Sequence, residues 1–267
     1  MMKSWLAALS LFTALGCGSL MASSINLGTI ASNNIAVLGY DSAQPTSSSV
    51  IVTNTGSTIN VTGNVISPVI TGASGLNFTA GSGTGTPTTQ EETDLANAVT
   101  ALNALTYTSL TISTGVNMIA PGDYTINGTI GSTMTIDLTG SGQYVFKTTG
   151  SLNFTNVTIN GNSSLSSDDV FWYTTGQATI TNSQVFGDVV QASASNALLR
   201  AASSGGTLSG TLTGRFLSEG FDTSLTAAQG ATLNINDFQA ASAAPEPATF
   251  AFVFAGLACL GTVRLRR

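Results

Sequence analysis

The sequence predicts an all-β domain with one helix, and three observations carry that prediction. Apolar and hydroxyl residues alternate over many short segments, such as 152–155 and 178–181, which is typical of half-buried strands. Glycine or asparagine interrupts the alternation at turn spacing. One stretch near residue 95 instead has apolar residues at helical spacing. Because the strands are short and the corners glycine-rich, the pattern favours a β-solenoid over a sandwich or barrel, which usually join longer strands by hairpin turns.

The first 24 residues are predicted to be a secretory signal peptide. A positive charge near the start is followed by the apolar stretch Trp5–Leu15 and then by small residues, which is the order such peptides have. We place cleavage after Ser24, with cleavage after Ala22 as the alternative. Cys17 raises the alternative of a lipoprotein, but the residues before it fit a lipidation box poorly.

One helix is predicted from about Gln90 to Leu105. Thr89 is expected to cap its start, with Glu92 three residues on completing a capping box. The helix would be about 24 Å long, and its apolar stripe must bury against another element, most simply the side of the β stack. The stripe consists of Leu95, Ala98, Val99, Leu102 and Leu105.

The predicted strands share one pattern, with Leu, Ile, Val or Phe facing inward and Thr, Ser or Asn facing outward. They lie at 110–113, 134–138, 152–155, 157–160, 178–181, 211–213 and 232–235. Residues 170–172 are predicted to form a further strand, and the alternation of Phe171, Trp172 and Tyr173 predicts one aromatic side in the core. Residues 191–206 are rich in Ala and Ser and fit the pattern less well, so the face near the C-terminal strands is expected to be less regular.

The C-terminal residues 245–267 resemble a sorting signal. Pro245, Glu246 and Pro247 precede an apolar run of 16 residues, and the chain then ends in Arg264, Arg266 and Arg267. The run is shorter than the ~20 residues that span a bilayer comfortably, and the arginines would stay on the cytoplasmic side. The alternative is an ordinary C-terminal membrane anchor, but the tripeptide favours sorting.

This ending is similar to the PEP-CTERM signal of Gram-negative bacteria. The resemblance implies that the tail inserts transiently into the membrane and that an exosortase-type protease removes it during export. The protein would then be secreted or held at the cell surface or in the extracellular matrix.

The charge and composition of the predicted mature chain, 25–244, exclude several classes of function. It contains three basic and twelve acidic residues, a net charge of −9, which argues against nucleic acid or anionic lipid as a partner. The whole sequence lacks histidine, and Cys17 and Cys259 both lie outside the mature range. The commonest general base, the commonest metal ligand and any disulfide are therefore missing. We expect no cofactor and no metal site.

No catalytic residue is predicted either. Asp168 and Asp169 are adjacent and would point to opposite sides of a strand, whereas a glycosidase needs two carboxyl groups facing each other across the bond that it cleaves. Asp188, Glu219 and Asp222 are scattered along the chain, with no basic partner apparent in the sequence.

Several short motifs occur in an order that resembles one family. They are residues 25–29, 35–38, 53–58, 61–68, 120–124, 143–146, 169–172 and 186–190. The ordered set is similar to bacterial ice-binding-like (antifreeze-type) domains and covers nearly all of 25–244. The resemblance implies a discontinuous, right-handed β-solenoid of triangular section with its single long helix packed alongside. It also implies that one flat, exposed face carries the activity, although the family offers no fixed motif for that face.

Ice recognition requires a flat, rigid surface with hydroxyls and methyls at regular spacing. Threonines on successive strands would repeat about every 4.8 Å across the stack and about every 6.7 Å along a strand. Threonine is also simply a favourable residue on an exposed strand, so only a collective array points to function. The candidates are Thr155, Thr158, Thr179, Thr181, Thr207, Ser209, Thr211 and Thr213.

Two functions therefore stand at this stage. The first is an exported, non-enzymatic protein that adsorbs to ice. The second is a structural or adhesion protein of an extracellular polysaccharide matrix built on the same fold. A polysaccharide-cleaving enzyme is a third class, which the scattered carboxylates disfavour.

Overall fold

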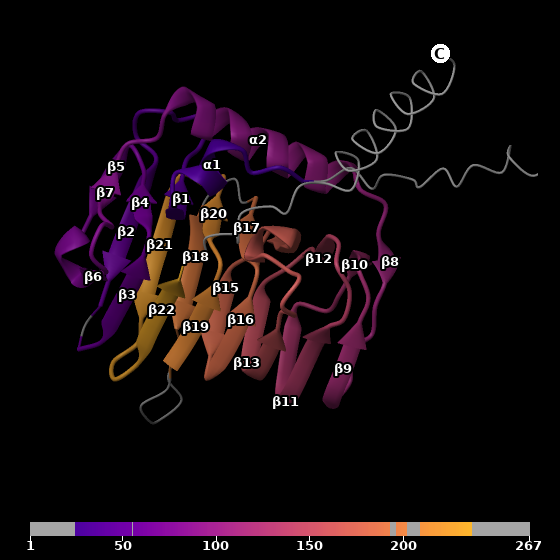
Figure 1. Cartoon of the computed structure of the whole chain (residues 1–267). Helices are drawn as coiled ribbons and strands as arrows, with labels where there is room; N and C mark the ends of the chain where they lie inside the picture. Colours follow the sequence, from indigo (N-terminus) through magenta and orange to yellow (C-terminus); the bar gives the residue numbers. More distant parts are fainter. Residues whose placement is uncertain (1–24, 55, 193–195, 202–208, 237–267) are drawn as a thin grey trace, which may run out of the picture.

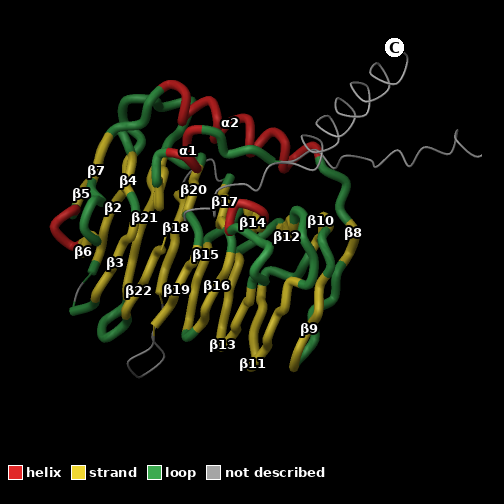
Figure 2. The backbone as a smooth tube through the Cα atoms, in the orientation of Figure 1, coloured by secondary structure: helices red, strands yellow, loops and turns green. Residues whose placement is uncertain are grey.

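The structure, a computed structural model, describes residues 25–54, 56–192, 196–201 and 209–236. Within them, neighbouring strands are parallel throughout. Figure 2 shows the strands as rows of rungs joined by loops, and Figure 1 shows one long helix lying along them. The predicted β-solenoid-like fold with a single long helix is confirmed, and its strands form three stacks.

The first stack lies under the helix, and most of its side chains are buried on both sides, against the interior on one side and the helix layer on the other. In spatial order its strands are β7 (Thr84–Gly85), β4 (Asn64–Ile66), β1 (Ile35–Gly39), β20 (Phe216–Ser218), β17 (Asp188–Gln191), β14 (Val170–Thr174), β12 (Tyr144–Thr148), β10 (Gly122–Thr125) and β8 (Thr108–Ser109).

The other two stacks each turn one side outward. The second consists of β5 (Val69–Thr71), β2 (Ser49–Thr53), β21 (Asp222–Ala227), β18 (Asn196–Ala201), β15 (Ala178–Thr181) and the first halves of β13 (Leu152–Asn160) and β11 (Thr129–Leu138). The third consists of β6 (Leu76–Phe78), β3 (Thr58–Thr62), β22 (Thr232–Asn236), β19 (Ser209–Thr213), β16 (Ser183–Phe186), the second halves of β13 and β11, and β9 (Gly115–Ile119). Short helical turns occur at α1 (Thr29–Ser32), η1 (Ala73–Gly75) and η2 (Ser167–Asp169).

The order of the strands in space is discontinuous in sequence. Strands β20, β21 and β22, at the C-terminal end of the described chain, pair with β1, β2 and β3 from its beginning. The N-terminal coils therefore occupy one end of the stack. The chain then runs along the helix to β8 and β9 at the far end, and the later coils fill the space between. Figure 1 shows this as early and late colours lying side by side.

The long helix α2 spans Thr89–Ala104, close to the predicted limits of about 90–105, but its cap was misplaced by one residue. Thr88 is the N-cap, and its capping box closes on Glu91. Thr88 and Thr89 are each followed by a glutamate three residues on, so the sequence offers two registers. The structure selects the one that turns Glu91 inward, where it also accepts a hydrogen bond from Asn33 (2.8 Å).

The predicted apolar stripe of α2 packs on the first stack. Leu95, Ala98, Val99 and Leu102 are buried, and Leu105 is partly buried at the end of the helix. They share a cluster with the outer side chains of the strands below, which are Leu38, Val145, Phe171, Tyr173, Val190 and Leu217. Burying each large apolar side chain stabilises the fold by about 1.5–3 kcal/mol, so this contact fixes the helix along the stack.

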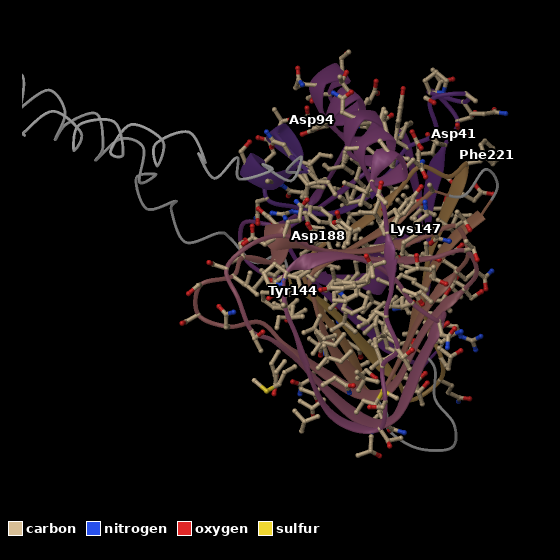
Figure 3. The ribbon with its side chains drawn as sticks, turned by 90° about the vertical axis from the view of Figure 1, so that its right-hand side faces the viewer. Asp41, Asp94, Tyr144, Lys147, Asp188 and Phe221 are labelled. Carbon is tan, nitrogen blue, oxygen red and sulfur yellow. The ribbon has the colours of Figure 1, made fainter. Side chains whose placement is uncertain are left out.

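Aromatic residues line the inner side of the first stack. The rings of Tyr124, Phe146 and Trp172 stack on successive strands, with centroid separations of 5.8 and 4.2 Å, and the Trp172 indole N–H donates to the Phe186 carbonyl (2.9 Å). The sequence predicted that only one aromatic side of β14 would lie in the core, but both sides of the strand are buried. Trp172 faces the interior, while its neighbours Phe171 and Tyr173 are buried beneath the helix. Figure 3, viewed along the stack, shows side chains filling the space between the stacks.

The corners between the second and third stacks use left-handed backbone conformations. Thr133, Asn156 and Asn182 have φ values of 59°, 53° and 47°. Asparagine tolerates this region better than most residues, and the Asn182 amide donates to the Asn156 side chain of the next coil (2.8 Å). This bend lets β13 pair with β15 before the corner and with β16 after it.

Two sequence predictions about strands were wrong. Residues 110–113 form a loop between β8 and β9, because they round the terminal coil with Leu110 and Ile112 only partly packed on the core. The irregular segment 191–206 does contain a regular strand, β18, which pairs with both β15 and β21. Small alanines at its inward positions, Ala197 and Ala201, leave only a weak apolar alternation in the sequence.

Gly214, at a corner between the third and first stacks, is expected to be intolerant of a side chain. Its φ is +147°, and a Cβ there would lie 2.2 Å from the Gly187 carbonyl oxygen of the next coil. We expect Gly214→Ala to lower the free energy of unfolding by at least about 2 kcal/mol, measured by urea denaturation. Gly150→Ala is the matched control, because a Cβ there meets nothing within 4 Å. Equal stability of the two variants would contradict this packing.

Candidate functional site

The structure divides the predicted threonines between two faces. Thr155, Thr179 and Thr181 lie on the second stack, whereas Thr158, Thr211 and Thr213 lie on the third. The backbone of Ser209 belongs to β19 on the third stack. Thr207 lies outside the described residues, as do the predicted signal peptide and the sorting residues 245–247, 264, 266 and 267.

The outward side of the second stack, here called the hydroxyl face, carries threonines in register across its strands. Thr179 lies opposite Asn153 on one neighbouring strand and Arg200 on the other. Arg200 in turn lies opposite Thr226, which lies opposite Thr53. These side chains form one row across the coils, and all of them are exposed or partly exposed.

Further rows flank the first. Thr155 and Thr181 form a second row with Gly131 at its end. A third row runs from Leu198 through Ser224 and Ile51 to Thr71. Rows of this kind are spaced by about 4.8 Å between strands and about 6.7 Å along a strand. The hydroxyl face thus presents hydroxyls and methyls on a two-dimensional lattice held by a buried, parallel sheet.

Several members of this face were missed from the sequence. Thr53, Ser224 and Thr226 alternate with buried residues in β2 and β21, and Thr71 follows the partly buried Ile70 in β5, so their strand character was visible in principle. Their position beside Thr179 depends on the pairing of β2 with β21, residues about 170 apart in sequence, and no local pattern encodes that pairing.

Arg200 interrupts the hydroxyl face. It is exposed and stands in the main row between Thr179 and Thr226. A guanidinium on a long side chain reaches well beyond the methyl groups of its neighbours and keeps its own hydration. It therefore separates a threonine patch on β11, β13 and β15 from another on β21, β2 and β5.

The outward side of the third stack, here called the amide face, has a different chemistry. Its central row is Asn77, Asn60, Asn234, Thr211, Gln184, Thr158, Thr135 and Val116. The Asn60 amide donates to the Asn234 side chain (2.7 Å), and Asn160 donates to Asp137 (2.8 Å). Larger amides and the partly exposed Phe186 ring make this face less uniform than the hydroxyl face.

Two of the aspartates considered as catalytic candidates belong to a buried ion cluster instead. Arg215, 1% exposed, contacts both Asp168 and Asp188 through its guanidinium, and its backbone N–H donates to Asp188 (2.7 Å). The expectation that Asp188 has no basic partner was wrong, because Arg215 lies on the next coil, 27 residues away. A buried ion pair costs stability when one partner is removed, so this cluster has a structural role in joining coils.

The described hollows bring no pair of carboxylates together. The larger one, about 250 Å³, lies beside α2 and is lined by Asn26, Gly28, Asp94, Asn97, Ala98 and Ala101. Burial alone raises the pKa of Asp94, but hydrogen bonds from Thr29 and Gln90 outweigh that effect and lower it. Asp94 is thus a hydrogen-bonded anchor for α1 rather than a general acid.

The described part of the chain also shows no metal centre and no membrane-spanning helix. No group of three or more acidic, histidine or cysteine side chains is placed there to hold a metal ion. Likewise, none of the helices within these residues is both long and apolar enough to cross a bilayer.

Comparison with solved structures finds ice-binding proteins. An ice-binding protein from an Antarctic biological consortium aligns with a TM-score of 0.55 and 17% identity over 79% of this chain and 91% of that one. One from an Antarctic Flavobacteriaceae bacterium gives 0.51 and 23% identity over 82% of this chain and 49% of that one. A glycosylated ice-binding protein from an Arctic yeast gives 0.50 and 19% identity over 84% and 97%.

These similarities establish the fold. No family model matches the sequence, and no curated protein matches it significantly. Because the identities are low, the function has to be argued from the faces of this chain itself.

Glu219 gives a prediction about how the stability of the fold depends on pH. Burial, together with the charge of Asp41, raises the pKa of Glu219. Ionised Glu219 therefore lowers the free energy of unfolding at neutral pH. We expect Glu219→Gln to raise the melting temperature at pH 7. The advantage should shrink as the pH falls through the raised pKa and vanish below the ordinary glutamate value of about 4.3, where both states are protonated. A gain that persists unchanged at pH 3 would contradict this origin.

Proposed function

We propose that this chain is an exported, non-enzymatic protein that adsorbs to ice through the hydroxyl face. The single observation that carries the proposal is the array of in-register threonines on a parallel sheet, flanked by a row with Ser224 and aliphatic side chains, with Thr179 near its centre. The fold that the chain has in common with solved ice-binding proteins supports the same conclusion.

The chemistry follows from the threonine side chain. Each hydroxyl can donate one hydrogen bond to water and accept two, while the adjacent methyl restricts where first-shell water can lie. Repeated over a rigid lattice, these groups hold a layer of water in a regular arrangement. Many such weak contacts on one plane add up to adsorption without any cavity or cofactor.

A regular coil supports the flatness that this mechanism needs. We propose that the coils wind in a right-handed sense with a triangular section, so that each stack forms one side. Right-handed crossovers are strongly preferred between parallel strands, and the three stacks meet at tight corners such as Asn156 and Gly214.

We also propose export through a signal peptide at 1–24 and removal of 245–267 by an exosortase-type protease, in a Gram-negative bacterium. The described fold supports these limits, because Ile25 and Leu27 are already buried in it and its last strand ends at Asn236. Cleavage after Ser24 and before Pro245 would leave the solenoid intact.

The amide face favours a second candidate, retention in an extracellular polysaccharide matrix. Gln184 is exposed there, and the Phe186 ring lies against Gly161, just after β13. Amides and an aromatic ring are groups that contact sugars well. Retention on the host's own matrix, lost on Gln184→Ala and Phe186→Ala, would favour this function over ice adsorption.

Replacing Thr179 tests the ice-binding proposal directly. Thr179→Tyr should place a bulky ring at the centre of the hydroxyl face and raise by about tenfold or more the concentration needed to inhibit ice recrystallisation, a loss of about 1.4 kcal/mol. Thr158→Tyr is the matched control on the amide face and should retain activity. The reverse pattern would move the site to the amide face, and activity in both variants would contradict a threonine-face mechanism.

Replacing Arg200 should have the opposite effect. Arg200→Thr joins the two threonine patches into one row, so we expect stronger inhibition of recrystallisation and more sharply faceted crystals. Arg200→Lys keeps a long cationic side chain and should resemble the parent protein. A loss of activity in Arg200→Thr would show that the guanidinium contributes to binding instead of interrupting it.

A further inference from the structure

Strand β9 forms an open end of the third stack. Among the described strands it pairs only with β11, and β8 beside it pairs only with β10. Figure 3 views the molecule from this end. An unpaired strand edge offers a row of main-chain donors and acceptors to another strand.

The hydrogen bonds to β11 determine which groups are free. The Thr139 N–H donates to the Ile119 carbonyl (2.9 Å), and in a parallel ladder alternate residues bond to the same neighbour. Asn117 and Ile119 therefore direct their main-chain groups toward β11. Val116 and Met118 direct theirs toward the open edge.

The same two residues expose apolar side chains. Val116 is 68% exposed and Met118 is 76% exposed, both on the outward side of the third stack. Natural edge strands usually carry a charge or proline that blocks pairing, but β9 reads Gly-Val-Asn-Met-Ile. At the opposite end, the exposed Val69 of β5 follows Pro68 directly and its strand has only three residues.

We propose that β9 is the interface for a second copy of this chain, paired antiparallel about a two-fold axis at Asn117. In that register Val116 lies opposite the partner's Met118 and Met118 lies opposite the partner's Val116. Each pair exchanges two main-chain hydrogen bonds, giving four in all, and each brings one exposed apolar side chain against another. The edge is complementary to itself, which is what a two-fold interface requires.

The remaining groups at this end are compatible with such pairing. Asn117 points inward, where its amide bonds to the Ser113 backbone N–H and carbonyl (3.0 and 2.7 Å), so it holds the strand without obstructing the edge. The nearest charge in register is Asp137, opposite Met118 on β11. Three strand spacings, about 14 Å, would separate it from the partner's Asp137, more than the screening length of about 8 Å at physiological salt.

The test is sedimentation velocity on the full chain, purified as the secreting host processes it, from low to high micromolar concentration. We expect reversible dimers that do not grow further. Met118→Lys adds a charge to the edge and should give monomers at every concentration. Val69→Lys makes the same kind of change, from an exposed apolar residue to lysine, at the opposite end of the stack. This variant should dimerise like the parent.

Three results would overturn the proposal. The parent chain could remain monomeric at the highest concentration, or it could form open-ended oligomers, which indicate head-to-tail stacking of the two different ends. Val69→Lys could also abolish association as effectively as Met118→Lys. Thermal unfolding followed by circular dichroism verifies that both variants fold, since both side chains are exposed. The pairing lies in the plane of the third stack, so it leaves the outward sides of both the second and the third stack uncovered.

Discussion

The rest of the structure depends on the pairing of the first coil with the last. Strands β1, β2 and β3 accept β20, β21 and β22 as parallel neighbours, in registers such as Val37 with Phe216 and Asn60 with Asn234. We call this contact between the first and last coils the seam. It can form only if the chain first runs to the far end of the stack and the later coils then fill the space back toward β1–β3. Nine strands of the first stack span about 38 Å, and α2, about 24 Å long, followed by a few extended residues to β8, covers that distance. The helix length and the number of coils are thus matched.

The seam also explains which features of the structure could be predicted from the sequence and which could not. Local alternation located six of the 22 described strands, and helical spacing placed α2 to within a residue of its limits. The register of its cap was ambiguous because Thr88 and Thr89 are both followed by glutamates at the right distance. Which threonines share a face depends on pairings between residues far apart in sequence. Thr155 and Thr158 were therefore only candidates in one list, and the structure separates them by a corner at Asn156. The Arg215 cluster was missed for the same reason, since its partners come from other coils.

The distribution of polar groups supports adsorption in preference to catalysis. Among the described residues, buried charge joins coils at Arg215, anchors the short helix at Asp94 and caps α2 at Glu91. The outward sides of the second and third stacks carry mainly hydroxyls, amides and scattered apolar side chains, and differ in their regularity. The hydroxyl face is the more uniform of the two apart from Arg200, so a planar, repeating ligand fits it better than a single small molecule would.

The measurement that tests this account most directly is the shape of ice crystals grown with residues 25–244 at micromolar concentration, alongside recrystallisation. The account predicts faceted crystals whose coarsening is arrested, because a rigid array of hydroxyls and methyls adsorbs to particular ice planes. A fold-matched protein without ice activity provides the baseline. Round crystals that coarsen freely in the presence of folded protein would contradict ice adsorption and leave the hydroxyl face without its proposed ligand.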